Sequence, residues 1–269
     1  MSLRYLLAGL FCIYLVQPWP LLASSPHHIN IGGEGFYRDY HEKLTPPFQS
    51  DEYGWLPALY LGYDFIAEQQ VYAGLDYRET RGHTVYNGSL QNIVSGRFAG
   101  LWQDMTHNEI RDIDARLGYN FKYQDQHHVI PYLFYGYHQW LRVIGFSSTT
   151  LELYQWNKIG LGLLYFWDFD NAWQLSLKAQ TNTIENAHMY APGYEKFSLA
   201  DEQGFDLELL LRYSFLKHRL HLKGGPFYRS QPIGQSPLTC KLDHTNCDTY
   251  EPESNTHIYG GRFSVELQF

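Results

Sequence analysis

The stretch Tyr259–Phe269, YGGRFSVELQF, ends the chain and alternates strictly between two kinds of residue. The first set is mainly apolar or aromatic and consists of Tyr259, Gly261, Phe263, Val265, Leu267 and Phe269. The second set is small or polar and consists of Gly260, Arg262, Ser264, Glu266 and Gln268. Because successive side chains of a β-strand point to opposite faces, this pattern predicts a strand with one apolar and one polar face.

The same alternation recurs upstream and predicts ten strands in all. They lie at about 28–40, 54–66, 70–80, 109–121, 129–142, 151–166, 172–184, 203–215, 219–230 and 255–269. Short connections near 67–69, 122–128, 167–171 and 216–218 alternate with longer ones near 41–53, 81–108, 143–150, 185–202 and 231–254. An even strand number with short turns at one end and long loops at the other is typical of bacterial outer-membrane barrels.

We therefore predict an all-β, antiparallel up-and-down transmembrane β-barrel of ten strands, with eight or twelve strands as the alternatives. Both ends of the barrel chain should lie in the periplasm, and residues 93–102 could form an extra β-ribbon above the membrane. A soluble secreted barrel would also alternate, but its apolar face would point inward. Aromatic residues make up 17% of the chain, which suits two aromatic belts at the lipid–water interfaces.

The N-terminus has the pattern of a secretory signal peptide. Arg4 precedes the apolar run Tyr5–Val16, and the small residues Ala23 and Ser24 offer a cleavage site. A membrane anchor is the alternative, but the run is short and prolines follow it. We expect cleavage of residues 1–23, which leaves one barrel domain at 24–269 with five extracellular loops. The net charge of −8 and the lack of a basic patch argue against nucleic-acid binding.

Cys240 and Cys247 are the two cysteines that remain after the signal peptide. An even pair in an exported protein predicts a disulfide. His244 and His257 nearby make a metal site the alternative, although the spacing matches no common zinc pattern. We expect the disulfide, no metal site and no cofactor.

The segment Gly261–Phe269 resembles the C-terminal β-signal of outer-membrane barrels, in which a final strand ending in Phe is recognised by the barrel-assembly machinery. The resemblance implies that Phe263, Val265, Leu267 and Phe269 form the assembly signal. The segment Pro131–Arg142, with Glu152, Tyr154 and Trp156 after it, is also similar to small bacterial outer-membrane β-barrel proteins. Outer-membrane lipid and lipopolysaccharide are then the expected surroundings, and we expect a monomer.

Turning the apolar faces toward lipid leaves the charged residues of the strands inside. The acidic ones are Glu34, Asp64, Asp76, Asp112, Asp114, Glu152, Asp206, Glu208 and Glu266, and the basic ones are Arg38, Arg78, Arg116, Arg142, Lys158, Lys178, Arg212, Lys223, Arg229 and Arg262, with His138 and His221. A ten-stranded barrel is only slightly wider than those whose interiors side chains just fill. Because buried charges must be paired, this near balance predicts an ion-pair network that plugs the lumen.

The leading functional hypothesis is a surface protein that displays loops for binding or envelope integrity. The loops 185–202 and 231–254 are acidic and contain aromatic residues, and loops on a rigid scaffold commonly carry function. A narrow porin-like channel for small solutes is the runner-up.

Two enzymatic hypotheses also have candidate residues. Outer-membrane proteases of the omptin family place D-x-D on one wall of the barrel mouth and D-x-H on the other. The pairs Asp112-x-Asp114 and Asp206-x-Glu208 resemble them over four residues, with Glu208 where the family has His. We expect both pairs at the outer rim on distant walls, without the base that activates water in that family. A lipid-modifying barrel would need a Ser/His pair, for which His138 with Ser147 or Ser148 is conceivable.

Overall fold

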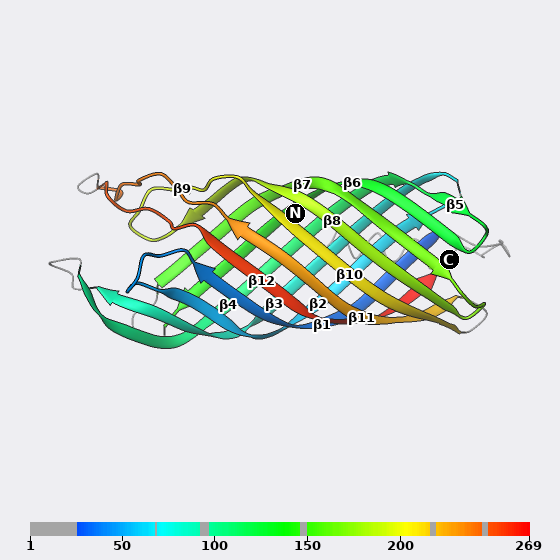
Figure 1. Ribbon diagram of the computed structural model, residues 1–269, viewed down its shortest axis with the longest axis horizontal. Helices are drawn as coiled ribbons and strands as arrows, with labels where there is room; N and C mark the ends of the chain where they lie inside the picture. Colours follow the sequence, from blue (N-terminus) through cyan, green and yellow to red (C-terminus); the bar gives the residue numbers. More distant parts are fainter. Residues whose placement is uncertain (1–25, 68, 92–96, 146–149, 216–218, 244–246) are drawn as a thin grey trace, which may run out of the picture.

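The computed structural model describes residues 26–67, 69–91, 97–145, 150–215, 219–243 and 247–269. The barrel strands are β1 (His27–Glu42), β2 (Ser50–Ile66), β3 (Val71–Gln91), β4 (Phe98–Tyr119), β6 (His127–Ile144), β7 (Thr150–Asp168), β8 (Trp173–Tyr190), β10 (Glu202–Phe215), β11 (Leu220–Ile233) and β12 (Ser254–Gln268). Two short strands, β5 (Phe121–Tyr123) and β9 (Phe197–Ser198), pair with β6 and β8 at the two ends. Every neighbouring pair is antiparallel, and Figure 1 shows the tilted strands wound into a cylinder.

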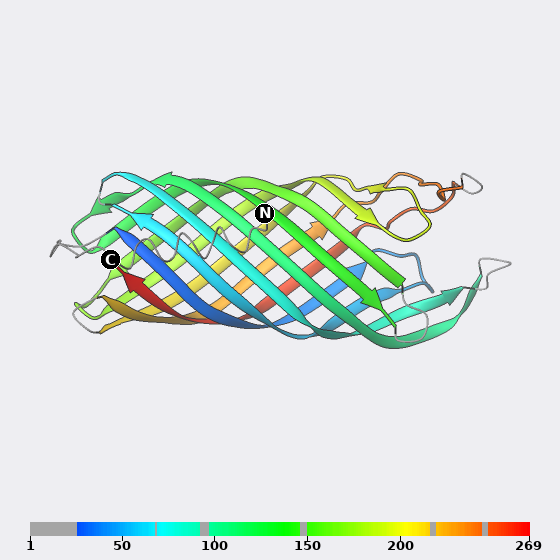
Figure 2. The ribbon, with the colours of Figure 1, turned by 180° about the vertical axis from the view of Figure 1, so that it is seen from behind.

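Each barrel strand pairs with the next along the chain, and the pairing of the last strand with the first closes the sheet. β8 pairs with β10, and the last strand, β12, pairs with β1 in one unbroken register from His28↔Gln268 to Glu42↔Ser254. The first described strand therefore begins where the chain ends, and Phe269 N donates to His27 O at 3.1 Å. The prediction of a closed ten-stranded antiparallel barrel is confirmed for the described residues. We call the end with the C-terminus the base and the end with β9 and the long loops the mouth (Figures 1 and 2).

The outer wall carries an apolar band. Residues expected to face lipid are exposed there, at 38–59% of their maximum, and are Leu61, Leu75, Leu117, Leu209 and Val265. On β12 the band runs from Tyr259 to Leu267, close to the roughly 9–11 residues with which a tilted strand crosses a bilayer. A soluble barrel would bury this face, so the exposed band marks a membrane-spanning barrel.

Aromatic residues bound the band at both edges. Toward the mouth, Tyr37 contacts Trp55 and Tyr259, with ring centroids 5.8 and 5.4 Å apart. At the base, exposed rings include those of Tyr119, Phe121, Tyr123, Trp167, Trp173 and Tyr213. Beyond the mouth-side belt the outer wall becomes charged, with Glu79 bonded to Arg81 at 2.8 Å. Amphipathic rings settle at membrane interfaces, so the barrel continues past the membrane on the mouth side.

β3 and β4 are longer than the sequence predicted. The connection expected at 81–108 is mostly strand, because β3 reaches Gln91 and β4 begins at Phe98. The two strands form a long hairpin that projects past the other barrel strands at the mouth, opposite the loop before β12 (Figures 1 and 2). The expectation of a ribbon confined to 93–102 was wrong in its bounds, and residues 92–96 lie outside the described residues. β2 likewise begins at Ser50, four residues earlier than expected.

The predicted disulfide between Cys240 and Cys247 is confirmed. It lies in the loop between β11 and β12, where Thr239 N donates to Thr249 O at 2.6 Å just outside the pair. Of the two histidines that made a metal site the alternative, His244 lies outside the described residues, and His257 Nδ1 lies 2.8 Å from the hydroxyl of Tyr228.

Replacing both cysteines by Ser should loosen this loop and leave the barrel folded. Closing a loop of this length stabilises by about 2–3 kcal/mol in the chain-entropy model. The loop should therefore be cleaved faster by protease, while the heat-modifiable gel mobility of the barrel stays the same. Two free thiols in the mass of unreduced wild-type protein would contradict the pairing.

The signal peptide predicted for residues 1–23 lies outside the described residues and stays a prediction. Within the described part of the chain, no helix is long and apolar enough to cross a membrane.

Candidate functional site

The structure places all of the charged residues predicted for the lumen inside the barrel. Four of them, Asp64, Glu152, Arg212 and Lys223, are half-buried, and the others are buried. They form three layers along the barrel axis. The layer at the base is centred on Glu266, the middle layer on Glu34 and Asp76, and the layer near the mouth on Arg142.

Glu34 is the most heavily paired carboxylate of the middle layer. Arg229 donates to both of its oxygens, at 2.8 and 2.9 Å, which is the bidentate geometry of a strong ion pair. Arg262 donates to Glu34 Oε1 from Nη2 at 2.6 Å and from Nε at 2.9 Å. The same guanidinium reaches Glu208 at 2.9 Å. Glu34 thus joins strands that are distant in sequence but adjacent in the closed barrel.

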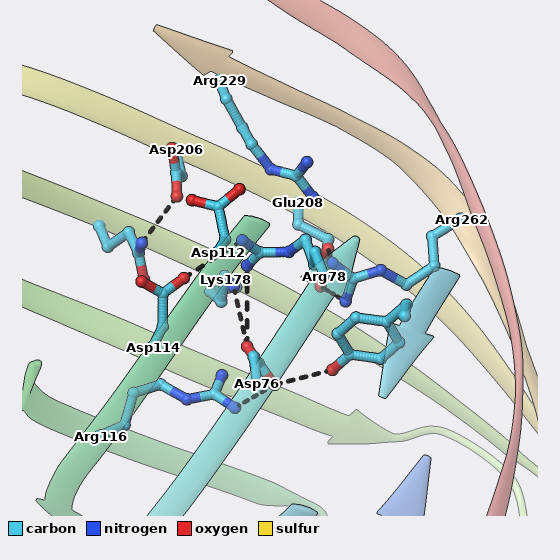
Figure 3. Close-up of polar contacts among 12 residues, drawn as sticks. Asp76, Arg78, Asp112, Asp114, Arg116, Lys178, Asp206, Glu208, Arg229 and Arg262 are labelled. Atoms are coloured by element: carbon cyan, nitrogen blue, oxygen red, sulfur yellow. Dashed lines mark hydrogen bonds and ion pairs between the residues drawn. The ribbon is translucent and has the colours of Figure 1, made fainter. Parts of the chain in front are cut away.

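Asp76 is a second centre, on which several dashed contacts converge in Figure 3. Arg116 Nη2 donates to Asp76 Oδ1 at 2.8 Å, and the hydroxyl of Tyr60 donates to the same oxygen at 2.9 Å. Arg78 and Lys178 lie at 3.8 and 3.9 Å from Oδ2. Three cations around one carboxylate are balanced by the carboxylates of neighbouring strands.

Asp112 and Asp114 are bridged by Lys158. Its Nζ lies 3.1 Å from Asp112 Oδ1 and 2.8 Å from Asp114 Oδ1, and Arg78 donates to Asp114 Oδ2 at 3.2 Å. Asp112 also contacts Nδ1 of His138 at 2.8 Å, and the His138 ring stacks on Trp156 at 3.9 Å. Every one of these groups is buried.

Equal numbers of opposite charges make up this middle layer, which we call the central charge network. It comprises six carboxylates and six cations, namely Glu34, Asp76, Asp112, Asp114, Asp206 and Glu208 with Arg78, Arg116, Lys158, Lys178, Arg229 and Arg262. An unpaired buried charge costs several kcal/mol. The balance lets the network remain charged inside the barrel without bound counter-ions.

Glycines make room for the network at two points. A Cβ on Gly136 would clash with Asp114 Oδ1 and lie 2.8 Å from Lys158 Cε. A Cβ on Gly162 would clash with the Tyr132 ring, whose hydroxyl donates to Gln180. Gln180 in turn donates to Asp206 at 2.7 Å. These positions therefore favour glycine because bulky polar side chains lie directly over the strand.

The layer near the mouth has an excess of carboxylates. Glu52 accepts from Arg38 at 2.9 Å and from Arg142 Nε at 2.8 Å, and also from Thr84 and Asn108. Arg142 Nη1 donates to Glu152 at 2.9 Å and lies 3.6 Å from Glu42. Glu251, from the loop before β12, enters the same layer. Four carboxylates therefore share two guanidinium groups.

Apolar side chains fill the barrel on both sides of the central charge network. Toward the mouth lies a cluster that includes Phe36, Tyr40, Leu56, Trp140, Tyr154, Trp156, Ile184, Met189, Phe197 and Ile233. Toward the base lie Tyr72, Ile130, Tyr132, Phe134, Leu164 and Phe166. A cavity of about 30 Å³ remains beside Asn30, Lys178 and Ser264, and it has room for about two water molecules.

The expected position of the catalytic candidates at the outer rim was wrong for Asp112 and Asp114. Because β4 begins at Phe98, these residues lie well inside the barrel. Asp112 and Asp114 are also close to the pair Asp206 and Glu208. Lys158 contacts both Asp112 and Asp114 and interacts electrostatically with Asp206 (Figure 3 shows these three carboxylates). Glu208 is occupied by Arg262. Cations or amides satisfy all four carboxylates, so these contacts give the protease hypothesis no support.

The pair named for the lipid-modifying alternative, His138 with Ser147 or Ser148, is not tested by the described residues. Ser147 and Ser148 lie outside them, and His138 is 2% exposed beneath Trp156. In the part of the chain that the structure describes, no group of three or more His, Cys, Asp or Glu side chains is arranged to hold a metal ion.

Glu42, Glu52 and Glu251 are interior residues that the sequence analysis missed. Glu52 is completely buried, yet it lies in a segment expected to be a loop. Leu56 and Ala58 of the same strand point inward, and side chains two residues apart point the same way. Continuing this alternation toward the N-terminus would have predicted Glu52 as an inward residue. Glu251 has no such signal, because a loop brings it into the barrel.

Comparisons with known proteins support the fold through one solved structure. The chain matches no protein-family model, and no curated protein matches its sequence. Among solved structures it is similar to the outer membrane protease OmpT from Escherichia coli, with a TM-score of 0.64 and 8% identity over 92% of this chain and 99% of that one. It is also similar to the outer membrane protein OprG from Pseudomonas aeruginosa, with a TM-score of 0.42 and 10% identity over 91% of this chain and 97% of that one. At 8% identity, the likeness to OmpT is one of fold.

Proposed function

We propose that the protein is an integral protein of the bacterial outer membrane whose lumen is closed by its own side chains and which acts through its mouth. The apolar band would face outer-membrane lipid and lipopolysaccharide, and the mouth would face the outside of the cell. The C-terminal signal on β12 would serve recognition by the barrel-assembly machinery. In this proposal the protein is a monomeric surface protein for binding or envelope integrity rather than an enzyme.

The central charge network is the observation that carries the closed lumen. A conducting pore needs an unfilled path lined by groups that face water. Here twelve opposite charges are buried and largely paired across the barrel. The apolar clusters lie above and below them, and the cavity beside Lys178 has room for about two water molecules.

The projecting β3–β4 hairpin supports a role in binding. It carries exposed apolar side chains on the mouth side of the barrel, which are Leu90, Phe98, Leu101 and Met105. Across the mouth, the loop before β12 exposes Leu238, Leu242 and Tyr250. Apolar groups presented to solvent on a rigid scaffold are typical of an interaction surface.

Planar-bilayer recording of the purified protein should show no steady conductance at neutral pH. The physical reason is that an ion would have to displace paired charges and then cross a packed apolar cluster. Protein recovered from the bilayer on a gel would show that insertion occurred.

Steady, ion-selective openings would overturn the closed lumen if Arg116→Gln changed their selectivity. Arg116 lies in the central charge network, whereas Arg111 lies on the outer wall with its side chain 44% exposed. Arg111→Gln is therefore the matched control and should leave any current unchanged.

A further inference from the structure

Two loops at the mouth are joined into one unit, which we call the lid. It consists of residues 191–201, before β10, and the described residues of 234–253, before β12. Glu195 N donates to Cys240 O and Leu242 N donates to Gly193 O, both at 3.0 Å. Ala200 N donates to Gln235 O at 3.3 Å. These backbone hydrogen bonds join the two loops, and the disulfide lies within the second of them.

Glu251 joins the lid to the barrel wall. Its backbone is fixed on the lid, because Glu251 N donates to Ser236 Oγ at 2.8 Å and Ser236 N donates to Glu251 O at 2.9 Å. Its side chain points into the mouth, where Glu251 Oε1 lies 2.5 Å from the hydroxyl of Tyr154 on β7. Backbone contacts also tie the lid to the barrel, since the short strand β9 pairs with β8 and Lys43 N donates to Glu253 O at 2.7 Å, beside an exposed ion pair of the same two side chains. Phe197 of β9 is buried in the apolar cluster toward the mouth, so Glu251 is one of several attachments of the lid.

The hydroxyl of Tyr154 cannot satisfy both carboxylates beside it. It lies 2.5 Å from Glu251 and 3.2 Å from Glu152 Oε2, and a phenol has one proton to donate. If both carboxylates were ionised, one of them would face the phenol oxygen with no proton between them. A proton on Glu251 resolves this, because Glu251 then donates to Tyr154 and Tyr154 donates to Glu152.

The surroundings of Glu251 also disfavour its charge. The groups that face it are Glu42 and Tyr40 from β1, Glu152 and Tyr154 from β7, and Arg142 from β6. Arg142 is already shared by Glu42, Glu52 and Glu152. Burial, together with the neighbouring carboxylates of Glu42 and Glu152, raises the pKa of Glu251 well above its usual range.

From this geometry we propose that Glu251 is a proton-dependent latch, which strengthens the docking of the lid on the barrel mouth when protonated and weakens it when ionised. The inference goes beyond the closed lumen, because it concerns the lid whether or not the barrel conducts.

The direction of the pH effect follows from the raised pKa. Below the ordinary pKa of a glutamate, Glu251 is protonated whether the lid is docked or released, so docking has its full strength. As the pH rises through the higher pKa of the docked state, the ionised carboxylate faces Glu152 and Glu42. Docking therefore weakens with rising pH and reaches its weakest level above that pKa.

Hydrogen–deuterium exchange of the full barrel in lipid nanodiscs tests the latch. Protection of the lid peptides 191–201 and 234–253, corrected for the intrinsic exchange rate at each pH, should fall at least tenfold from pH 5 to pH 9. Glu251→Gln keeps a hydrogen-bond donor without the charge, and its protection should be the same at both pH values. Glu253→Gln is the matched control on the same lid, and it should retain the wild-type fall.

Three outcomes would overturn the latch. They are a wild-type lid equally protected at pH 5 and pH 9, a Glu251→Gln lid that loses protection as wild type does, and a Glu251→Gln lid unprotected at both values. If Glu251→Gln fails to fold, Tyr154→Phe serves instead, and its lid should already be at least tenfold less protected than wild type at pH 5. Bilayer recording separates the two proposals, since a conducting barrel with a pH-sensitive lid would refute the closed lumen alone.

Discussion

Replacing Glu34 by Gln should lower the free energy of unfolding by about 3–5 kcal/mol, the cost of breaking a buried ion pair by removing one partner. The side chain of Glu34 is completely buried and pairs with both Arg229 and Arg262. Gln has nearly the same shape but leaves these two guanidinium groups with one fewer negative charge. Denaturant unfolding of the barrel in detergent micelles, followed by tryptophan fluorescence, would measure the loss.

Glu79→Gln is the control for this experiment. Glu79 lies on the outer wall above the mouth-side belt and is bonded to Arg81, whose side chain is 60% exposed. An exposed ion pair contributes about 0–1 kcal/mol, so this variant should unfold close to wild type. The double variant Glu34→Gln with Arg229→Gln should lose less than the sum of its single variants, because it removes both charges of one pair. Equal losses for Glu34→Gln and Glu79→Gln would contradict the central charge network.

The sequence predicts a strand where the two faces of that strand differ in polarity. Where a strand crosses lipid, one face must be apolar while the lumen accepts charge, so residues such as Leu117 and Arg116 alternate visibly. Above the membrane this requirement ends. The outward residues of β3 there include Arg81, His83 and Asn87, which differ little in polarity from the inward ones, such as Thr84. The long hairpin was missed for this reason.

Which charged side chains pair inside the lumen depends on the stagger of the strands, and the alternating sequence pattern does not contain this information. Residues that meet across the barrel are chosen by the stagger of the strands when the sheet closes. Glu34 and Arg229 are 195 positions apart in the sequence, and no local pattern links them. The sequence thus predicts which side chains enter the lumen but not which of them meet. The error over Asp112 and Asp206 is of this kind, since an expectation of distant walls ignored how narrow the barrel is.

The second large effect is expected at the lipid-facing surface. Leu209 lies on the outer face of β10 between Leu207 and Leu211, with aromatic rings at Phe205 and Tyr213 toward the two edges of the band. This position is near the membrane midplane, where an Arg costs about 2–4 kcal/mol. Leu209→Arg should therefore reduce the fraction of protein that reaches the heat-modifiable, folded form.

Arg212→Leu is the comparison that assigns the faces. Arg212 points inward near the base, and its side chain is 16% exposed beside Glu266 at 3.3 Å. Glu266 keeps Lys223 at 2.9 Å when Arg212 is lost. Asp168, 3.8 Å from Arg212, loses its cation, but its side chain is 33% exposed and still accepts from Gln174 at 2.8 Å. Arg212→Leu should therefore reduce the folded fraction clearly less than Leu209→Arg does, even though both variants exchange the same two residue types. If the heat-modifiable form survives Leu209→Arg but not Arg212→Leu, the lipid-facing and lumen-facing sides of β10 have been assigned the wrong way round.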